Sequence, residues 1–186
     1  KNAELQYATM YKSNIFNANF VGADMTGANF CHEFLARQDF TGTNLHKADL
    51  SRANLSNANL QNANVTEINL SGANLSGVNL SNKDLTNANL NGAILYKTNF
   101  DNANLSGADL RNVILNQTSF RNANLSYAYL AGVNFTNTDM SGSVQKHVNL
   151  EKIPRFDISE TDLSGVDLTG KNLSQVNLSG TDLSGA

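Results

Sequence analysis

A large apolar residue recurs at every fifth position through most of this chain. From Leu5 to Met140 there are 28 such central positions, and all 28 are apolar: 17 Leu, 6 Phe, 3 Met, Ile15 and Val65. The position two residues before the centre is Ala in 16 of the 28 repeats, and the position directly before it is Asn or Asp in 21. An internal repeat of this kind limits the fold more strongly than any local motif.

A period of five residues fits neither an α-helix nor a flat strand. On a helix the central residues would spiral around the axis, because five residues overshoot one turn by about 140°. On a flat strand, successive centres would point to opposite faces. The pattern works if the chain bends after each short extended piece, with Gly, Asn and Ser in the bend. Four bends then close a coil of about 20 residues, and stacked coils pair about 4.8 Å apart.

Residues 20 apart should therefore lie above one another in columns. We expect Asn side chains that stack on the outside to form amide ladders. Inside the fourth side of the coil, we expect stacked aromatic rings and Thr–Thr contacts. The columns concerned are Asn54 with Asn74; Asn59 with Asn79 and Asn99; Phe20 with Phe40, Phe100 and Phe120; and Thr98 with Thr118 and Thr138.

The repeats Ala73-Asn74-Leu75-Ser76-Gly77 and Ala108-Asp109-Leu110 resemble those of the pentapeptide repeat family. This resemblance implies an all-β fold, a right-handed quadrilateral β-helix. With about 20 residues per coil, the 186 residues make a solenoid of about nine coils. The resemblance also implies one candidate function, because some members of the family resemble a DNA duplex and bind gyrase.

A few inward positions carry polar residues instead of Ala. A buried, unpaired carboxylate is costly, so we expect a local bulge that brings Glu33 to water, with Gln38 in the same stretch. Lys83 is expected to extend its ammonium to solvent at the edge of its coil. Cys31 and His32 precede Glu33 directly, and consecutive residues rarely converge on one ion, so no metal site and no cofactor is expected.

Two outward groups are candidates for binding another protein. Ile94 and Ile114 stack in a column that normally holds Asn, with Tyr96 beside them and with Tyr127 and Tyr129 one or two coils further on. Exposed apolar and Tyr-rich patches often mark interaction sites. The second group is a basic corner formed by Lys12, His32 and Arg52 at 20-residue spacing. It would either hold an anionic group of a partner or simply face water.

The register fails after Met140. Residues 1–150 are expected to form the main solenoid, residues 151–156 a loop or kink around Pro154, and residues 157–186 further repeats of the same solenoid. Lys152 and Arg155 make this loop a further candidate contact, since loops on rigid scaffolds often carry function. A tolerated insertion is the other interpretation.

Composition limits the function classes. The formal net charge of −3 does not indicate a nucleic-acid-binding face, and no apolar run is long enough to cross a membrane. No set of nucleophile, base and orienting group is apparent, so we expect no enzyme. The favoured function is a rigid scaffold for protein–protein interaction. The alternative is a DNA-mimicking inhibitor or protector of DNA gyrase.

The ends of the chain give two further expectations. The chain begins at Lys1 rather than Met, so we expect a processed chain or a fragment. A cytoplasmic location is favoured, while lumenal, periplasmic and secreted locations stay open. Because both ends resemble uncapped coils, we also expect either a homodimer formed by end-to-end stacking or a longer chain.

Overall fold

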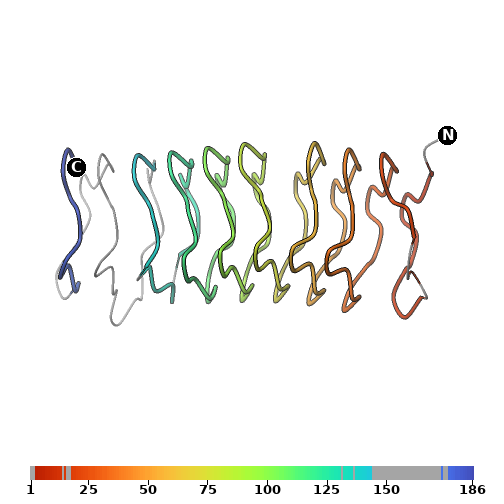
Figure 1. Ribbon diagram of the computed structural model, residues 1–186, viewed down its shortest axis with the longest axis horizontal. Coiled ribbons are helices and arrows are strands. Elements are labelled where there is room, and N and C mark those ends of the chain that lie inside the picture. The colour runs from red at the N-terminus through yellow and green to blue at the C-terminus, as the bar shows by residue number, and fades with distance from the viewer. Residues whose placement is uncertain are drawn as a thin grey trace.

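The computed structural model of the chain describes residues 3–13, 15, 18–130, 132–135, 137–143, 173 and 176–186. Short coils stack side by side in a single row, with the N-terminal coils at one end and the last described residues at the other (Figure 1). The predicted break at residues 151–156, with Lys152 and Arg155, lies outside the described residues.

Each coil is built from four short extended pieces joined by tight turns. In the described part of the chain there is no helix and no named strand, and all β-pairing consists of isolated parallel bridges between residues 20 apart. The amide of Leu75, for example, donates to the carbonyl of Ile94 in the next coil at 2.8 Å, while the amide of Val78 closes the turn onto the Leu75 carbonyl at 3.0 Å. The 20-residue coil predicted from the apolar period is therefore observed.

The four sides of a coil can be numbered in chain order. Between one side and the next lies a corner made of the two residues that follow a centre. The outward columns, as linked by the bridges, are Glu4, Asp24, Asn44 and Asn64, then Asp84, Asn104 and Asn124 on the first side; Thr9, Asn29, Asp49, Asn69, Asn89, Asp109 and Tyr129 on the second; Phe34, Asn54, Asn74, Ile94 and Ile114 on the third; and Asp39 and Asn59, then Asn79, Asn99, Ser119 and Asp139 on the fourth.

The central residues and the small residues two positions before them form one continuous apolar core. Leu75 and Ala73, for instance, are both fully buried. On the fourth side the predicted aromatic stacking is confirmed: the rings of Phe100 and Phe120 lie nearly parallel with centroids 4.9 Å apart. Burial of these columns is the main stabilising term, at about 25 cal/mol per Å² of apolar area.

The predicted threonine contacts take a different form. Thr98 Oγ1 donates to the Leu75 carbonyl at 2.9 Å, and Thr118 Oγ1 donates to the Leu95 carbonyl at 2.7 Å, so the hydroxyls bond the backbone rather than one another. Most buried hydroxyls are hydrogen-bonded. Thr138 Oγ1, in the same column, is buried without a hydrogen-bond partner among the described residues.

Amide ladders are present, but not in the predicted columns. Asn64 Nδ2 donates to Asn44 Oδ1 on the first side, and Asn69 Nδ2 donates to Asp49 Oδ1 on the second, both at 2.9 Å. The predicted ladders are wrong: among the described residues no side-chain bond joins Asn54 to Asn74 or links the amides of residues 59, 79 and 99.

The second corner residue takes a left-handed backbone conformation throughout the described coils. Positive φ angles of 53–77° occur there at Gly and Asn and also at larger residues such as Lys12, Arg52 and Lys97. Gly and Asn reach this conformation most readily, which explains why they recur in the bend. At Gly77 a side chain would also overlap Asn57 Oδ1 of the preceding coil.

Candidate interaction surfaces

The outward Asn or Asp caps the turn that follows it. Asn74 Oδ1 accepts the amide of Ser76 at 3.0 Å and the Ser76 hydroxyl at 2.6 Å, and Asp39 Oδ1 accepts the amide and hydroxyl of Thr41 in the same way. This is an Asx-turn, in which a side-chain oxygen satisfies the backbone amide two residues on. The bond accounts for the dominance of Asn and Asp in the outward position, a role that the repeat pattern alone did not reveal.

Three residues on the third side give up this bond. Phe34, Ile94 and Ile114 have no side-chain oxygen, and the amides of Ala36, Tyr96 and Asn116 two residues on have no hydrogen-bond acceptor among the described residues. The three side chains face outward, with exposed fractions of 73% for Phe34, 37% for Ile94 and 58% for Ile114. The third side is therefore the apolar side of the solenoid.

The structure brings together only part of the predicted apolar group. Ile94 and Ile114 pair directly across adjacent coils, and Tyr96 lies on the corner that follows Ile94. Tyr129 instead pairs with Asp109 on the second side, and Tyr127 lies on the corner between the first and second sides. The predicted single patch is therefore wrong, because residues that are close in sequence lie on different sides of a square coil.

Tyr129 has a polar environment of its own. The guanidinium of Arg111 lies 5.7 Å from the centre of the Tyr129 ring, and it also pairs with Asp109 at 2.6 Å. Burial opposes ionisation of Asp109, but the hydrogen bonds from Arg111 outweigh it and the pKa of Asp109 is lowered. Arg111 is thus held over the second side.

The basic corner has the predicted arrangement. Lys12, His32 and Arg52 are exposed and occupy equivalent corner positions in successive coils between the second and third sides. Tyr11 joins them: its ring lies 6.2 Å from the His32 ring, and Lys12 Nζ lies 5.0 Å from the Tyr11 centroid.

The predicted bulge around Glu33 is not observed, because the bridges of Asn29, Phe34 and Asp39 to residues 20 positions later continue through this stretch. Glu33 is half-buried, and its Oε1 atom accepts the amide of Lys12 from the preceding coil. The Cys31 sulfur accepts a hydrogen bond from the Ser51 hydroxyl at 3.2 Å. No group of three or more His, Cys, Asp or Glu residues suited to a metal gathers in the part of the chain that the structure describes.

Lys83 opens the solenoid at one corner. Its Nζ atom donates to the Ala63 carbonyl at 2.9 Å, a carbonyl that an uninterrupted ladder would use for the amide of Asp84. Gln38 does the same nearer the start of the chain, where its Nε2 donates to the Ala18 carbonyl at 2.8 Å. A long polar side chain in the inward position thus takes the carbonyl of the residue 20 positions earlier.

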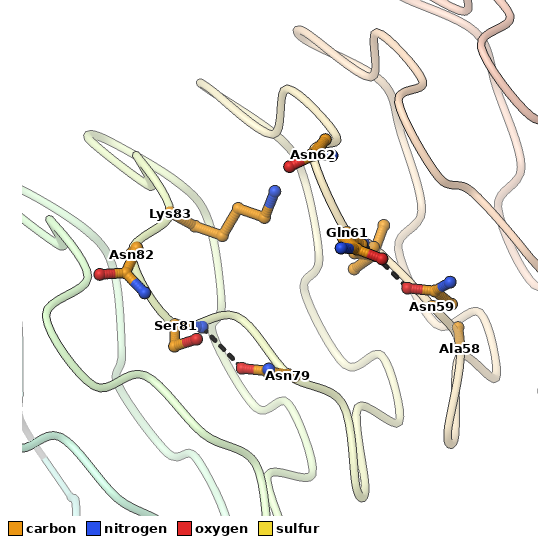
Figure 2. A pocket seen from close by; sticks show the side chains of 9 residues that line it. Ala58, Asn59, Gln61, Asn62, Asn79, Ser81, Asn82 and Lys83 are labelled. Atoms are coloured by element: carbon orange, nitrogen blue, oxygen red, sulfur yellow. Dashed lines mark hydrogen bonds between the residues drawn. The ribbon is translucent and has the colours of Figure 1, made fainter.

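The opening is a pocket on the corner between the fourth and first sides. In this region the described bridges stop between Asn59 and Asn79 on the fourth side and between Asn64 and Asp84 on the first. Figure 2 shows the Lys83 side chain extending from its coil toward the coil that carries Asn62. The pocket has a volume of about 410 Å³, and burial lowers the pKa of Lys83. Its lining consists of Ala58, Asn59, Leu60, Gln61, Asn62, Asn79, Ser81, Asn82 and Lys83.

A family profile described as pentapeptide repeats matches eight copies over residues 1–31, 35–72, 68–107, 103–142 and 157–186. The chain belongs to the pentapeptide repeat family. No individual curated protein sequence matches this pentapeptide repeat protein.

Solved structures of other members resemble it. One trypsin-treated form of QnrB1, a plasmid-mediated fluoroquinolone resistance protein, is 20% identical with a TM-score of 0.65, covering 88% of this chain and 83% of QnrB1. Another trypsin-treated form is 21% identical with a TM-score of 0.58, covering 98% and 90%. HetL, a pentapeptide repeat protein involved in heterocyst differentiation regulation from the cyanobacterium Nostoc sp. strain PCC 7120, is 28% identical with a TM-score of 0.37, covering 100% and 86%.

The similarity to the two QnrB1 structures concerns the fold only. Pentapeptide repeat proteins form right-handed β-helices, so the predicted fold class and handedness apply to this chain. The part of the chain that the structure describes contains no helix long and apolar enough to cross a bilayer.

Proposed function

We propose that this protein is a rigid, non-enzymatic scaffold of about nine coils that binds another protein through its third side. The main support for this proposal is the outward column at Ile94 and Ile114. These residues expose apolar surface and leave turn amides uncapped where Asn would satisfy them. Features that break a local rule without a structural gain are commonly functional.

The surroundings support a binding role over a catalytic one. The pocket beside Lys83 holds a single titratable side chain, so it offers no acid–base pair. Most other described outward residues cap the turn that follows them, and the coils form a straight row, a geometry suited to presenting contacts in columns (Figure 1).

Site-specific photocrosslinking in cells of the source organism tests this proposal. A photoreactive phenylalanine at position 94 or 114 should give a discrete protein adduct. Matched positions at Asn69 and Asn89, which are outward on the second side, should give none. Adducts of equal yield from both sides, or none from the third side, would contradict the proposal.

A second candidate is a DNA-mimicking inhibitor or protector of DNA gyrase. It is supported by the fold shared with QnrB1, a fluoroquinolone resistance protein, and by the outward carboxylates. These carboxylates lie on three different sides of the solenoid, at Asp24 and Asp84, at Asp49 and Asp109, and at Asp39 and Asp139. With a net charge of −3 the field of the molecule is weak. A gyrase supercoiling assay without any effect at micromolar protein would remove this candidate.

Two proposals concern the chain as a whole. The first divides it into a main solenoid at 1–150, a loop at 151–156 that includes Lys152 and Arg155, and further repeats at 157–186. The second is end-to-end pairing of two copies, for which Leu183, with an exposed fraction of 38%, is the candidate contact. Light scattering on the wild-type chain and on Leu183→Glu tests the pairing, and a strictly monomeric wild-type chain at high concentration would refute it.

A further inference from the structure

The described basic side chains form two groups, those with and those without an ion pair or a side-chain hydrogen bond, and the two groups occupy different parts of the solenoid. Four of these side chains, Lys12, Arg37, Arg52 and Lys97, make no ion pair or side-chain hydrogen bond with any described residue. All four lie on the two corners that flank the third side. Lys12 and Arg52 are on the corner shared with the second side, and Arg37 and Lys97 are on the corner shared with the fourth.

The other described cations are neutralised or tied down. Lys47 pairs with Glu67 at 3.6 Å, and Arg121 pairs with Asp139 at 3.5 Å. Arg111 pairs with Asp109 and is held over the second side. The ammonium of Lys83 is bound to the Ala63 carbonyl. Among the described residues between 3 and 143, unpaired positive charge is therefore confined to the borders of the third side.

Acidic residues show the opposite distribution. Every outward or corner Asp and Glu described between residues 3 and 143 lies on the other three sides or on the two corners away from the third side. Between residues 3 and 143, Glu33 is the one described carboxylate within the third side. It occupies an inward position, and its Oε1 accepts the Lys12 amide. A partner approaching the described part of the third side thus meets cations at both edges and no outward carboxylate between them.

The outward column beside the two basic edges is apolar at its two ends, and Asn54 and Asn74 separate the apolar residues. Phe34, Ile94 and Ile114 project from it, and Tyr96 lies on its edge with Lys97 Nζ 5.1 Å from the ring centre. Arg, Tyr and Phe are enriched at protein interfaces, whereas Asp, Glu and Lys are depleted. The third side has this composition, apart from its two lysines.

We propose that the third side binds an acidic segment of a partner protein, whose carboxylates pair with the two basic edges while its apolar side chains pack on Ile94 and Ile114. This inference rests on the proposed scaffold function and names the chemistry of the partner. The planar guanidinium groups of Arg37 and Arg52 match a carboxylate in a two-pronged hydrogen bond. Charges that complement one another across an interface set orientation and raise the association rate.

The spacing of the edges defines what fits. Lys12 and Arg52 are two coils apart, and Arg37 and Lys97 are three coils apart, so the cations on each edge are separated by roughly 10 and 14 Å along the axis. Two outward positions between the apolar residues are Asn54 and Asn74, so there is no continuous apolar face for insertion into a bilayer on the described part of this side.

Fluorescence anisotropy with the full chain tests this proposal. The probe is a labelled peptide in which Glu residues are separated by Tyr and Leu, and its control is the same peptide with Gln in place of Glu. The acidic peptide should bind, binding should weaken as salt increases, and the Gln peptide should bind far less. The double variant Arg52→Gln/Lys97→Gln should weaken binding by about tenfold or more, because both edges then lose a charge.

The matched control is Lys47→Gln/Arg121→Gln. It also removes two positive charges, but from corners away from the third side. It should change the affinity by less than about twofold. Melting curves establish that both variants are folded. The proposal is overturned if the two double variants weaken binding equally, if the acidic peptide does not bind, or if phosphatidylserine vesicles or oligo-dT bind through the third side in its place. Photocrosslinking from positions 94 and 114 reports separately on the scaffold function, since it does not depend on the charge of the partner.

Discussion

The ammonium of Lys83 lies 2.9 Å from the carbonyl oxygen of Ala63, the residue directly across from it in the preceding coil. This bond substitutes a side chain for the amide of Asp84 in the ladder. The adjoining bridges on the fourth and first sides are absent from the described pairing in the same place. One lysine in the position of an alanine therefore interrupts two of the four sides, while the second and third sides continue past it.

Replacing Lys83 with Ala should close this opening and stabilise the protein. The small side chain lets the two coils approach, and each restored backbone hydrogen bond contributes about 1 kcal/mol. Thermal unfolding should shift to higher temperature, and amide exchange at Asp84 should slow. Lys97→Ala, on an exposed corner, is the control and should stay within about 0.5 kcal/mol of wild type. A lower melting temperature for Lys83→Ala would mean that the opening is not caused by this side chain.

The same variant should change the alkaline dependence of stability. Burial lowers the pKa of Lys83 from its ordinary value of 10.5, so the unfolded chain binds the proton more tightly than the folded one. Between the lowered pKa and 10.5, the wild type should gain stability as pH rises. Below that window the cost of burying the ammonium is fully present. The advantage of Lys83→Ala should therefore shrink as pH approaches 10.5, and an advantage that grows with pH would contradict this account.

Ile114→Asn should raise stability, and Asn74→Ile should lower it. The amide oxygen introduced at position 114 would accept the backbone amide of Asn116, as Asn74 Oδ1 accepts the amide of Ser76 at 3.0 Å in wild type. Ile114→Asn should raise the free energy of unfolding by about 0.5–1.5 kcal/mol and Asn74→Ile should lower it by a similar amount, since this is the usual net contribution of one hydrogen bond. Both positions are outward on the third side, so the pair is matched for location. Chemical denaturation measures the difference, and a shift of both variants in the same direction would show that capping does not control stability here.

Much of the fold follows from the sequence because the apolar period is incompatible with the alternatives. A large apolar residue at every fifth position is compatible only with a repeatedly bent chain, and the small residue two positions earlier, most often Ala, determines which side of each short piece points inward. Leu75 and Ala73 lie where this argument places them. The same periodicity places Lys12, His32 and Arg52 on one corner, because residues 20 apart must stack.

The surface chemistry was harder to predict because it depends on contacts between coils and on the turn inside one repeat. Tyr127 and Tyr129 follow Ile114 closely in sequence, yet a square coil turns them away from it. Columns of Asn suggest ladders, but the side-chain oxygen of an outward Asn is oriented mainly by its hydrogen bond to the amide two residues on, within the same turn. The inward Lys83 indicates a disturbance, while its partner, the Ala63 carbonyl, is identified only once the coils are stacked.

Two carboxylates should give the protein a sensitivity to acid. Hydrogen bonds from the hydroxyl and amide of Thr26 lower the pKa of Asp24, and those from Thr41 lower the pKa of Asp39. Because the folded-state pKa lies below the ordinary value of 3.8, this stability is present above that value and is lost as pH falls through the lowered pKa. The variant Asp24→Asn/Asp39→Asn keeps the turn acceptors without the charge, so its melting temperature should fall less than that of wild type in this window. Identical acid profiles would contradict the assignment.

Leu75→Asp should unfold the centre of the solenoid. Leu75 is fully buried between Leu55 and Leu95 of the neighbouring coils, and the core there contains no partner for a carboxylate. An unpaired buried charge, together with the loss of apolar contacts, costs more than about 4 kcal/mol, a large part of the stability of a domain of this size. Because each coil contacts mainly its neighbours, the loss should spread outward from this coil. Circular dichroism would follow the loss of β-structure, and Leu75→Met, which conserves volume, should cost less than about 1.5 kcal/mol. A melting curve for Leu75→Asp close to that of wild type would place residue 75 on the outside and overturn the register on which the numbering of all four sides depends.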